Sequence, residues 1–191
     1  MTAIVPLREP GHGKSRLTPH LSADERAVVS ESMLATVVHA LRGGGVEHVV
    51  VAAGGPRAAA AAAALGVDAL LDPEPATLDD ALAAAARTLD ALDLLVVAAD
   101  LPGVSAADIT ALLASPARVV VAPTRDGGTA ALLRRPHDVI PSAYGVGSAQ
   151  RHVDLAVAAG VWVEIIERDG LALDVDTWDD LVAARERGDR V

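Results

Sequence analysis

The sequence of 191 residues contains no cysteine, so neither a disulfide framework nor a thiolate metal site is possible. It also contains no phenylalanine, one tyrosine and two tryptophans, and its core must therefore be built from alanine, valine, leucine and isoleucine. No apolar run reaches the roughly 18 residues that a membrane span needs. The N-terminus also lacks the charged-then-apolar order of a secretory signal. These absences predict a cytoplasmic protein that does not associate with a membrane.

Positive charge is scarce, and almost all of it is arginine. The sequence has 16 lysines and arginines and 26 aspartates and glutamates, which gives a formal net charge of -10 at pH 7. This balance argues against a nucleic-acid partner, which needs a basic face, but it still allows a small anionic substrate. The only lysine is Lys14. Because lysine and arginine are not equivalent at a phosphate, its position indicates a place where an ammonium is useful.

Hydrophobic residues make up 51% of the chain, which is enough for one sizeable core in a single domain over residues 1–191. Short apolar runs alternate with segments of helical periodicity. This alternation predicts an α/β fold with a doubly wound, mostly parallel sheet. Strands are expected over 2–7, 46–52, 69–71, 94–99, 118–122, 130–133, 161–167 and 171–175. Helices are expected over 23–43, 56–65, 78–91, 105–114, 149–159 and 177–186, with a stiff loop at 72–75.

Three aspartates stand where two of the expected strands end. Asp174 and Asp176 are separated by one residue, so in an extended segment both side chains point to the same face. Asp100 ends an apolar run and precedes a Pro-Gly turn, as when a buried parallel strand delivers a carboxylate to the edge of a sheet. Oxygen donors from two strand ends suit a hard divalent cation such as Mg2+. The alternative is that each aspartate only caps the helix that follows it.

The loop after the first strand, residues 8–17, has the composition of a phosphate site. It contains two glycines, a proline and the cations Arg8, Lys14 and Arg16. Backbone N–H groups and these cations are expected to hold the phosphates of a nucleotide. The segment is not a P-loop, because Arg8 stands where that motif needs its first glycine. An ordinary polar turn is the alternative.

A second glycine-rich loop, residues 140–148, opens the helix that follows it, with Ser148 near the N-cap. A helix N-terminus preceded by glycines is a ready anion site, although a simple loop and cap would have the same composition. Between the two loops, Arg125 either assists at the site or forms an ion pair with Asp126. The six histidines are scattered, and we expect most of them at the surface or in structural roles.

Several short motifs follow one another along the chain in a recognisable order. They are Val5-Pro6-Leu7 with Gly13-Lys14-Ser15-Arg16-Leu17, Asp100-Leu101-Pro102, Arg125-Asp126-Gly127-Gly128-Thr129, Tyr144-Gly145-Val146-Gly147-Ser148 and Leu171-Ala172-Leu173-Asp174-Val175-Asp176-Thr177. In this order the chain resembles the CofC/FbiD family from end to end. Those proteins are 2-phospho-L-lactate or phosphoenolpyruvate guanylyltransferases of coenzyme F-420 biosynthesis. The resemblance implies a Rossmann-like nucleotidyltransferase fold, shared with molybdenum-cofactor guanylyltransferases.

The resemblance also implies substrates and site residues. The substrates would be GTP and a small phosphorylated acid, with phosphoenolpyruvate favoured, and the products a guanylated acid and pyrophosphate. The family pattern implies that Asp100, Asp174 and Asp176 hold Mg2+. It implies that Thr129, Gly145 and Ser148 bind the acid. The nucleotide phosphates would be bound by Lys14, Arg16 and Arg8. One departure is Arg8, where the family pattern leads us to expect a lysine.

The expected reaction needs no general base, because a phosphate dianion is already ionised at neutral pH. Catalysis would then rest on Lys14 and on the three aspartates with their metal, which bring two anions together. Two other functions fit the sequence: a nucleotidyltransferase with a sugar-phosphate or pterin-phosphate acceptor, and a metal- or nucleotide-binding α/β module without turnover. The short loop at 145–148 favours a small acid. The chain is compatible with a monomer or a homodimer.

Overall fold

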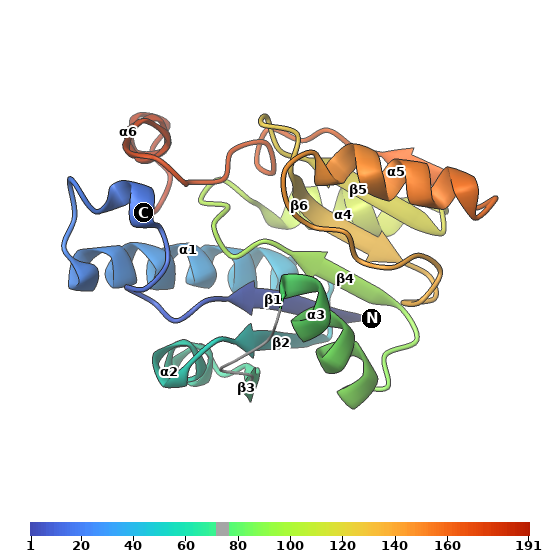
Figure 1. The fold of residues 1–191 in the computed structure, drawn as a ribbon, viewed down its shortest axis with the longest axis horizontal. Coiled ribbons are helices and arrows are strands. Elements are labelled where there is room, and N and C mark those ends of the chain that lie inside the picture. Colours follow the sequence, from blue (N-terminus) through green and yellow to red (C-terminus); the bar gives the residue numbers. More distant parts are fainter. Residues whose placement is uncertain (72–76) are drawn as a thin grey trace.

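Seven strands form one mixed sheet in the computed structural model, which describes residues 1–71 and 77–191 (Figure 1). The order across the sheet is β3-β2-β1-β4-β6-β5-β7. Within the described residues, only β6 runs antiparallel to its neighbours. The strands are β1 (Thr2–Leu7), β2 (His48–Ala53), β3 (Asp68–Leu71), β4 (Leu94–Val97), β5 (Val119–Pro123), β6 (Thr129–Arg134) and β7 (Val163–Ile165). The mostly parallel α/β sheet that the sequence predicted is confirmed.

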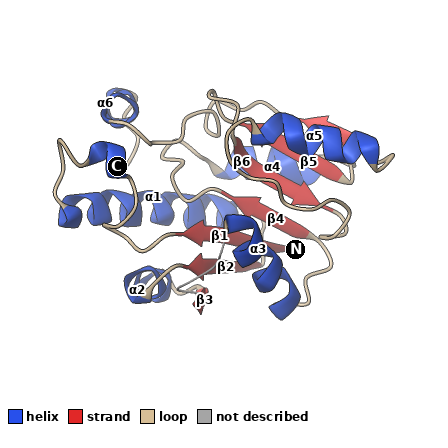
Figure 2. Ribbon diagram, in the orientation of Figure 1, coloured by secondary structure: helices blue, strands red, loops and turns tan. Residues whose placement is uncertain are grey.

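Helices cover both faces of this sheet, as a doubly wound fold requires (Figure 2). They are α1 (Ala23–Gly43), α2 (Pro56–Ala64), α3 (Leu78–Thr88), α4 (Ala106–Ala114), α5 (Ser148–Ala158) and α6 (Trp178–Glu186), with a short 3-10 helix, η1 (Ser15–Leu17). Their positions match the expected helices to within a few residues at each end. The stiff loop expected at 72–75 lies outside the described residues.

The two helical layers follow from the alternation of side chains along each strand. On β1, Val5 packs with residues of α1, α2 and α4, whereas its neighbour Ile4 packs with residues of α3. On β5, Val120 faces the first group of helices, and Val121 packs against α5. Because aliphatic side chains point to both faces, the strands read as continuous apolar runs in the sequence.

The segment predicted as a last strand over 171–175 is not a strand. Its side chains alternate as in a strand, with Leu171, Leu173 and Val175 buried. Its backbone, however, makes single hydrogen bonds to two different loops, from Val175 N to the carbonyl of Asp100 and from Arg125 N to the carbonyl of Ala172. Alternation of buried and exposed side chains is typical of a strand. It does not show that a neighbouring strand is present to form the hydrogen bonds of a sheet.

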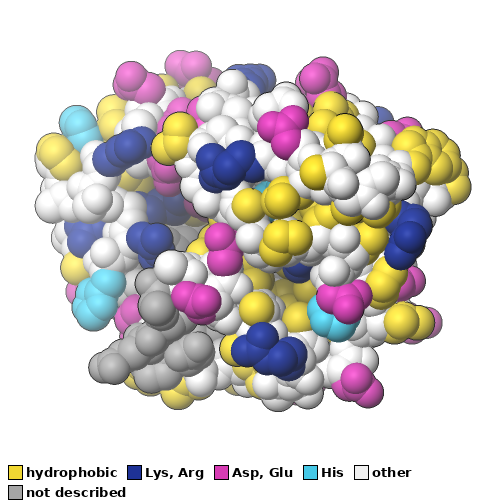
Figure 3. Space-filling model, turned by 45° about the vertical axis from the view of Figure 1, so that its right-hand side comes forward, with side chains coloured by type: hydrophobic (Ala, Val, Ile, Leu, Met, Phe, Trp, Pro, Cys, Tyr) yellow, Lys and Arg dark blue, Asp and Glu magenta, His cyan; other side chains and the backbone are white. Residues whose placement is uncertain are grey.

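The surface of the molecule mixes charges of both signs. Figure 3 shows acidic and basic side chains interspersed across the face that it draws. None of the helices in residues 1–71 and 77–191 combines the length and apolar character needed to cross a bilayer.

Candidate functional site

The site forms where the strand order of the sheet reverses direction. β1 and β4 lie side by side, but the chain continues from β1 to β2 on one side and from β4 towards β5 on the other. Loops that leave the carboxyl ends of two such strands diverge and open a crevice, which is where ligands bind in open α/β sheets. The loop after β1 carries Lys14, and the loop after β4 carries Asp100.

The single lysine lies between two of the predicted metal ligands. Nζ of Lys14 donates a hydrogen bond to Oδ2 of Asp100 at 2.8 Å and another to Oδ1 of Asp176 at 3.4 Å. The lysine side chain is only 10% exposed. Burial alone lowers the pKa of Lys14, but the two carboxylates outweigh it and raise the pKa above its ordinary value. The ammonium is therefore charged, and it links the ends of three distant segments.

The backbone of residues 171–176 fixes the positions of the two C-terminal aspartates. The N–H of Val175 donates to the carbonyl of Asp100 at 3.1 Å, which joins this segment to the loop after β4. Leu173 and Val175 are buried against α1 and α6. Because side chains alternate in an extended segment, Asp174 and Asp176 point to the opposite side, as their spacing predicted.

The aspartates do not serve as helix caps, which was the alternative prediction. α6 begins with a capping box between Thr177 and Asp180, and α4 begins with one between Ser105 and Asp108. In both boxes the hydroxyl accepts from the backbone N–H three residues on, and the carboxylate returns to the backbone of the cap residue. The carboxylates of Asp100, Asp174 and Asp176 lie outside both boxes.

Asp174 is the aspartate whose ionisation is most disturbed. Burial, together with the negative charges of Asp100, Asp126 and Asp176, raises its pKa to about 6. A carboxyl held among like charges is a usual sign of a site that binds a cation. Asp126 was not predicted as part of this group. Its neighbour in sequence, Arg125, forms no ion pair with it in the described residues, which leaves the predicted pairing without support.

The carboxylate group fits a hard cation by its chemistry, because it supplies only oxygen donors with excess negative charge. As the side chains stand, no group of three or more histidine, aspartate or glutamate side chains within 1–71 and 77–191 is arranged to hold a metal ion. The ammonium of Lys14 occupies the space between Asp100 and Asp176 instead.

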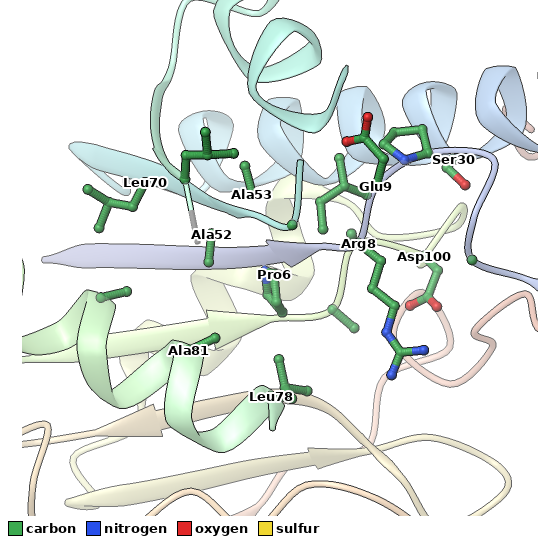
Figure 4. Close-up of a pocket in the computed structure, with 18 of the residues that line it drawn as sticks. Pro6, Arg8, Glu9, Ser30, Ala52, Ala53, Leu70, Leu78, Ala81 and Asp100 are labelled. Carbon is green, nitrogen blue, oxygen red and sulfur yellow. The ribbon is translucent and has the colours of Figure 1, made fainter. Parts of the chain in front are cut away.

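A cavity of about 930 Å3 opens beside the lysine (Figure 4). Its polar end is formed by Arg8, Lys14, Asp100 and Asp176. Its other end is apolar and lies between α3 and the ends of β2 and β3; it is lined by Ala52, Ala53, Leu70, Leu71, Leu78, Ala81 and Ala85. A pocket with one charged end and one flat apolar end has the size and chemistry for a nucleotide.

The predicted phosphate cations occupy different places. The side chain of Arg8 extends into the cavity on the same side as Asp100 (Figure 4). Arg16 is exposed and lies outside the cavity lining; after hydrogen bonding from Thr124 and Gly128, its charge is a further cause that lowers the pKa of Asp126. Hydrogen bonding from Thr124 is the main cause of the same shift.

Glu9 lies next to Arg8, but its carboxylate serves the fold. It accepts hydrogen bonds at 3.1 Å from the backbone N–H groups of Arg57 and Ala58, which begin α2. The first N–H groups of a helix have no partner within the helix and favour negative charge. A Cβ on Gly55 would lie 2.2 Å from Oε2 of Glu9, so a larger residue at that position would push this carboxylate out of place. Glu9 thereby anchors the loop after β1 to the sheet edge.

The residues predicted to bind the acid meet at the start of β6 and α5. Oγ1 of Thr129 lies 2.9 Å from Oγ of Ser148, and both side chains are buried. Gly145 has a φ of +109°, a backbone conformation that favours glycine. Thr129 lies at the same edge of the sheet as Asp100, because β6 begins where the neighbouring β4 ends. None of these three residues lines the cavity, so the predicted acid subsite is separate from it.

The loop that contains Gly145 is shaped by Arg151. Its guanidinium donates to backbone carbonyl groups of Ala143, Tyr144 and Val146. In a trans peptide the carbonyl and the following N–H point in opposite directions. The N–H groups of Gly145 and Gly147 therefore point away from Arg151.

His152 also belongs to this subsite, and the sequence prediction assigned it no role. Its Nδ1 lies 3.0 Å from Oγ1 of Thr129, and its ring is fully buried. The signal that could have identified it is spacing. His152 follows Ser148 by four residues in α5, so the two side chains share one face of the helix.

Comparisons with known proteins agree with this geometry. Residues 1–188 match the family model described as "Guanylyl transferase CofC like". A phosphoenolpyruvate guanylyltransferase of Conexibacter woesei is 40% identical, over 96% of this chain and 86% of that protein. A 3-phospho-D-glycerate guanylyltransferase of Phenylobacterium zucineum is 36% identical, over 94% of this chain and 87% of that protein.

The solved structures show the same fold at lower identity. A nucleotidyl transferase from Methanothermobacter thermautotrophicus superposes with a TM-score of 0.71 at 19% identity, covering 97% of this chain and 96% of that one. With the family match over nearly the whole length, and with the family's acidic and glycine-rich motifs gathered at one edge of the sheet, the chain belongs to the CofC-like guanylyl transferase family.

Proposed function

We propose that the protein transfers the guanylyl group of GTP to the phosphate of a small phosphorylated carboxylic acid and releases pyrophosphate, as a step of coenzyme F-420 biosynthesis. Phosphoenolpyruvate is the favoured acid. The observation that carries the proposal is the meeting of Lys14, Asp100 and Asp176 at the polar end of the cavity. An adjoining pair of buried hydroxyls, on Thr129 and Ser148, supplies the second subsite that a two-substrate reaction needs.

In this proposal the nucleotide lies in the cavity with its base in the apolar end and its phosphates at the polar end. Arg8 and Lys14 then lie beside the phosphates and balance their charge, and Arg16 approaches from the surface. The acid lies against Thr129, Gly145 and Ser148, so that its phosphate oxygen faces the α-phosphorus. Positioning of two anions against each other supplies a large part of the rate acceleration in such transfers.

Asp100, Asp174 and Asp176 are the residues that would hold Mg2+. When bound, the metal supplies electrostatic stabilisation of the charge that shifts to the leaving pyrophosphate. The chain's own contribution is the ammonium of Lys14, which holds Asp100 and Asp176 together and lies at the polar end of the cavity, where it would balance the charge of a phosphate.

The experiment that tests this proposal measures pyrophosphate release with GTP, Mg2+ and one acid at a time. Phosphoenolpyruvate, 2-phospho-L-lactate and 3-phospho-D-glycerate form the panel, because the relatives named above differ in the acid that they use. Turnover that depends on one of these acids supports the proposal. Turnover only with a sugar phosphate or a pterin phosphate would favour a different acceptor. Nucleotide binding without release, whichever acceptor is added, would favour a binding module.

A further inference from the structure

The imidazole of His152 contacts two groups of opposite hydrogen-bonding character. Its Nε2 accepts a hydrogen bond from the backbone N–H of Ala143 at 3.0 Å, and its Nδ1 lies 3.0 Å from Oγ1 of Thr129. Because a backbone N–H only donates, Nε2 carries no hydrogen, and the hydrogen of the neutral ring is on Nδ1. Burial, with the positive charges of Arg134 and Arg151, lowers the pKa of His152 to about 4. The ring is therefore neutral near pH 7.

The hydrogen on Nδ1 limits what the two neighbouring hydroxyl groups can do. Oγ1 of Thr129 accepts from Nδ1 and lies 2.9 Å from Oγ of Ser148. The two hydroxyls carry two hydrogens, and their mutual hydrogen bond uses one of them. The other cannot be donated to His152, because the ring already presents a hydrogen there. Among the described residues neither hydroxyl has a further acceptor, so this second hydrogen is left for a ligand.

We propose that His152 is a positioning residue that keeps the hydroxyl pair of Thr129 and Ser148 in a donating state, with one hydrogen directed at an anionic oxygen of the phosphorylated acid. The inference rests on the proposed function, which places the acid at this subsite. The opposite tautomer would consume the second hydrogen internally. The pair would then present only oxygen lone pairs, which repel an anion. His152 thereby favours an ionised phosphate or carboxylate at this position over a hydrogen-bond donor.

The tautomer can be tested without any activity. The nitrogen-15 chemical shifts of the ring distinguish a protonated from an unprotonated nitrogen, and His152 is identified by comparing wild-type protein with the His152→Asn variant. We expect Nε2 of His152 to be unprotonated and Nδ1 to be protonated at neutral pH. A proton on Nε2 would overturn the proposal, whatever the enzyme does.

Two substitutions separate a positioning role from a purely structural one. An asparagine side chain ends close to the place of Nδ1 and can still donate to Thr129, but it cannot reach the N–H of Ala143. A glutamine side chain ends close to the place of Nε2, so it can accept from Ala143 but leaves Thr129 without its donor. If His152 only supports the backbone at Ala143, glutamine is the better replacement. If it orients the hydroxyls, asparagine is better.

The expected kinetic result follows from this contrast. His152→Asn should keep the KM for the acid within about threefold of wild type, and His152→Gln should raise it about tenfold to a hundredfold, the range for one hydrogen bond to a charged group. The KM for GTP should change by less than about threefold in both variants, since the cavity is separate. His39→Gln, at an exposed position of α1, is the matched control.

The outcomes are distinguishable from a failure of the proposed function. Better performance of His152→Gln than of His152→Asn, or equal changes in the KM for acid and for GTP, would overturn the role of His152. Absence of pyrophosphate release by the wild-type protein with every acid would refute the proposed function instead. The tautomer measured by NMR would then still decide whether the hydroxyl pair is held in its donating state.

Discussion

The buried imidazole of His152 makes the stability of the protein depend on pH in a narrow window. The ordinary pKa of 6.5 applies to the unfolded chain, whereas burial and two nearby arginines lower the pKa to about 4 in the folded protein. Between these values the unfolded state binds the proton and the folded state does not. Acidification therefore removes stability as pH falls from about 6.5 to about 4, and none of this loss occurs above that range.

The size of this effect follows from the two pKa values. A fall in the pKa from 6.5 to about 4 corresponds to about 3 kcal/mol of unfolding free energy, most of which is lost by about pH 4.5. The side chain is fully buried, so solvent screening does not reduce this value much. The loss is a sizeable fraction of the stability of an ordinary domain.

Urea unfolding of the wild-type and His152→Asn proteins, between about pH 7.5 and about pH 4.5, measures the contribution of this group. Aspartates and glutamates titrate in both proteins, so the difference between the two curves isolates His152. We expect the wild type to lose about 2–3 kcal/mol more than the variant over this range. Parallel curves would refute the assignment of a buried neutral ring. His39→Asn, which alters an exposed histidine, should behave as wild type.

Three further predictions concern the carboxylate site and its support. Lys14→Ala should raise the KM for GTP at least tenfold and the KM for the acid much less, as steady-state kinetics will show; equal increases would place Lys14 elsewhere. Asp176→Ala should retain the circular dichroism of the wild type but lose about a thousandfold in turnover, so that near-normal turnover would exclude a principal metal ligand. Arg168→Ala removes the 2.8 Å ion pair with buried Asp108 and should lower the unfolding free energy by about 1–3 kcal/mol, whereas exposed Arg87→Ala should change it by less than about 0.5 kcal/mol.

Much of the fold could be read from the sequence because the central strands are apolar on both faces and four of the described helices, α1, α3, α4 and α6, begin with a Ser or Thr cap. The box formed by Ser22 and Glu25 placed the start of α1 correctly. The last predicted strand was wrong for a reason that local patterns cannot reveal. Residues 171–175 alternate between buried and half-buried side chains as a strand would, but 171 and 172 lie in a turn and the segment hydrogen-bonds to loop residues Asp100 and Arg125 instead of to a strand.

The candidate site could be predicted in part because the sequence positions of its acidic residues indicate where their side chains lie in the fold. The spacing of Asp174 and Asp176 specifies a shared face, and the position of Asp100 specifies a sheet edge. Asp126 gave no such signal, because its proximity to Asp174 depends on how two separate loops pack. His152 was missed because its contact with the buried hydroxyl of Thr129, on β6, joins two positions that are far apart in sequence.

The solitary lysine has a practical consequence for chemistry on this protein. Apart from the terminal amine, Lys14 carries the one primary amine in the sequence, and both of its hydrogen-bonded carboxylates shield it from electrophiles. An acylating reagent should react slowly with it while those contacts persist and faster when a cation draws a carboxylate away. The extent of Lys14 acylation, measured by peptide mass spectrometry, would then show whether a cation is bound at the site. No label would have to be introduced by mutation.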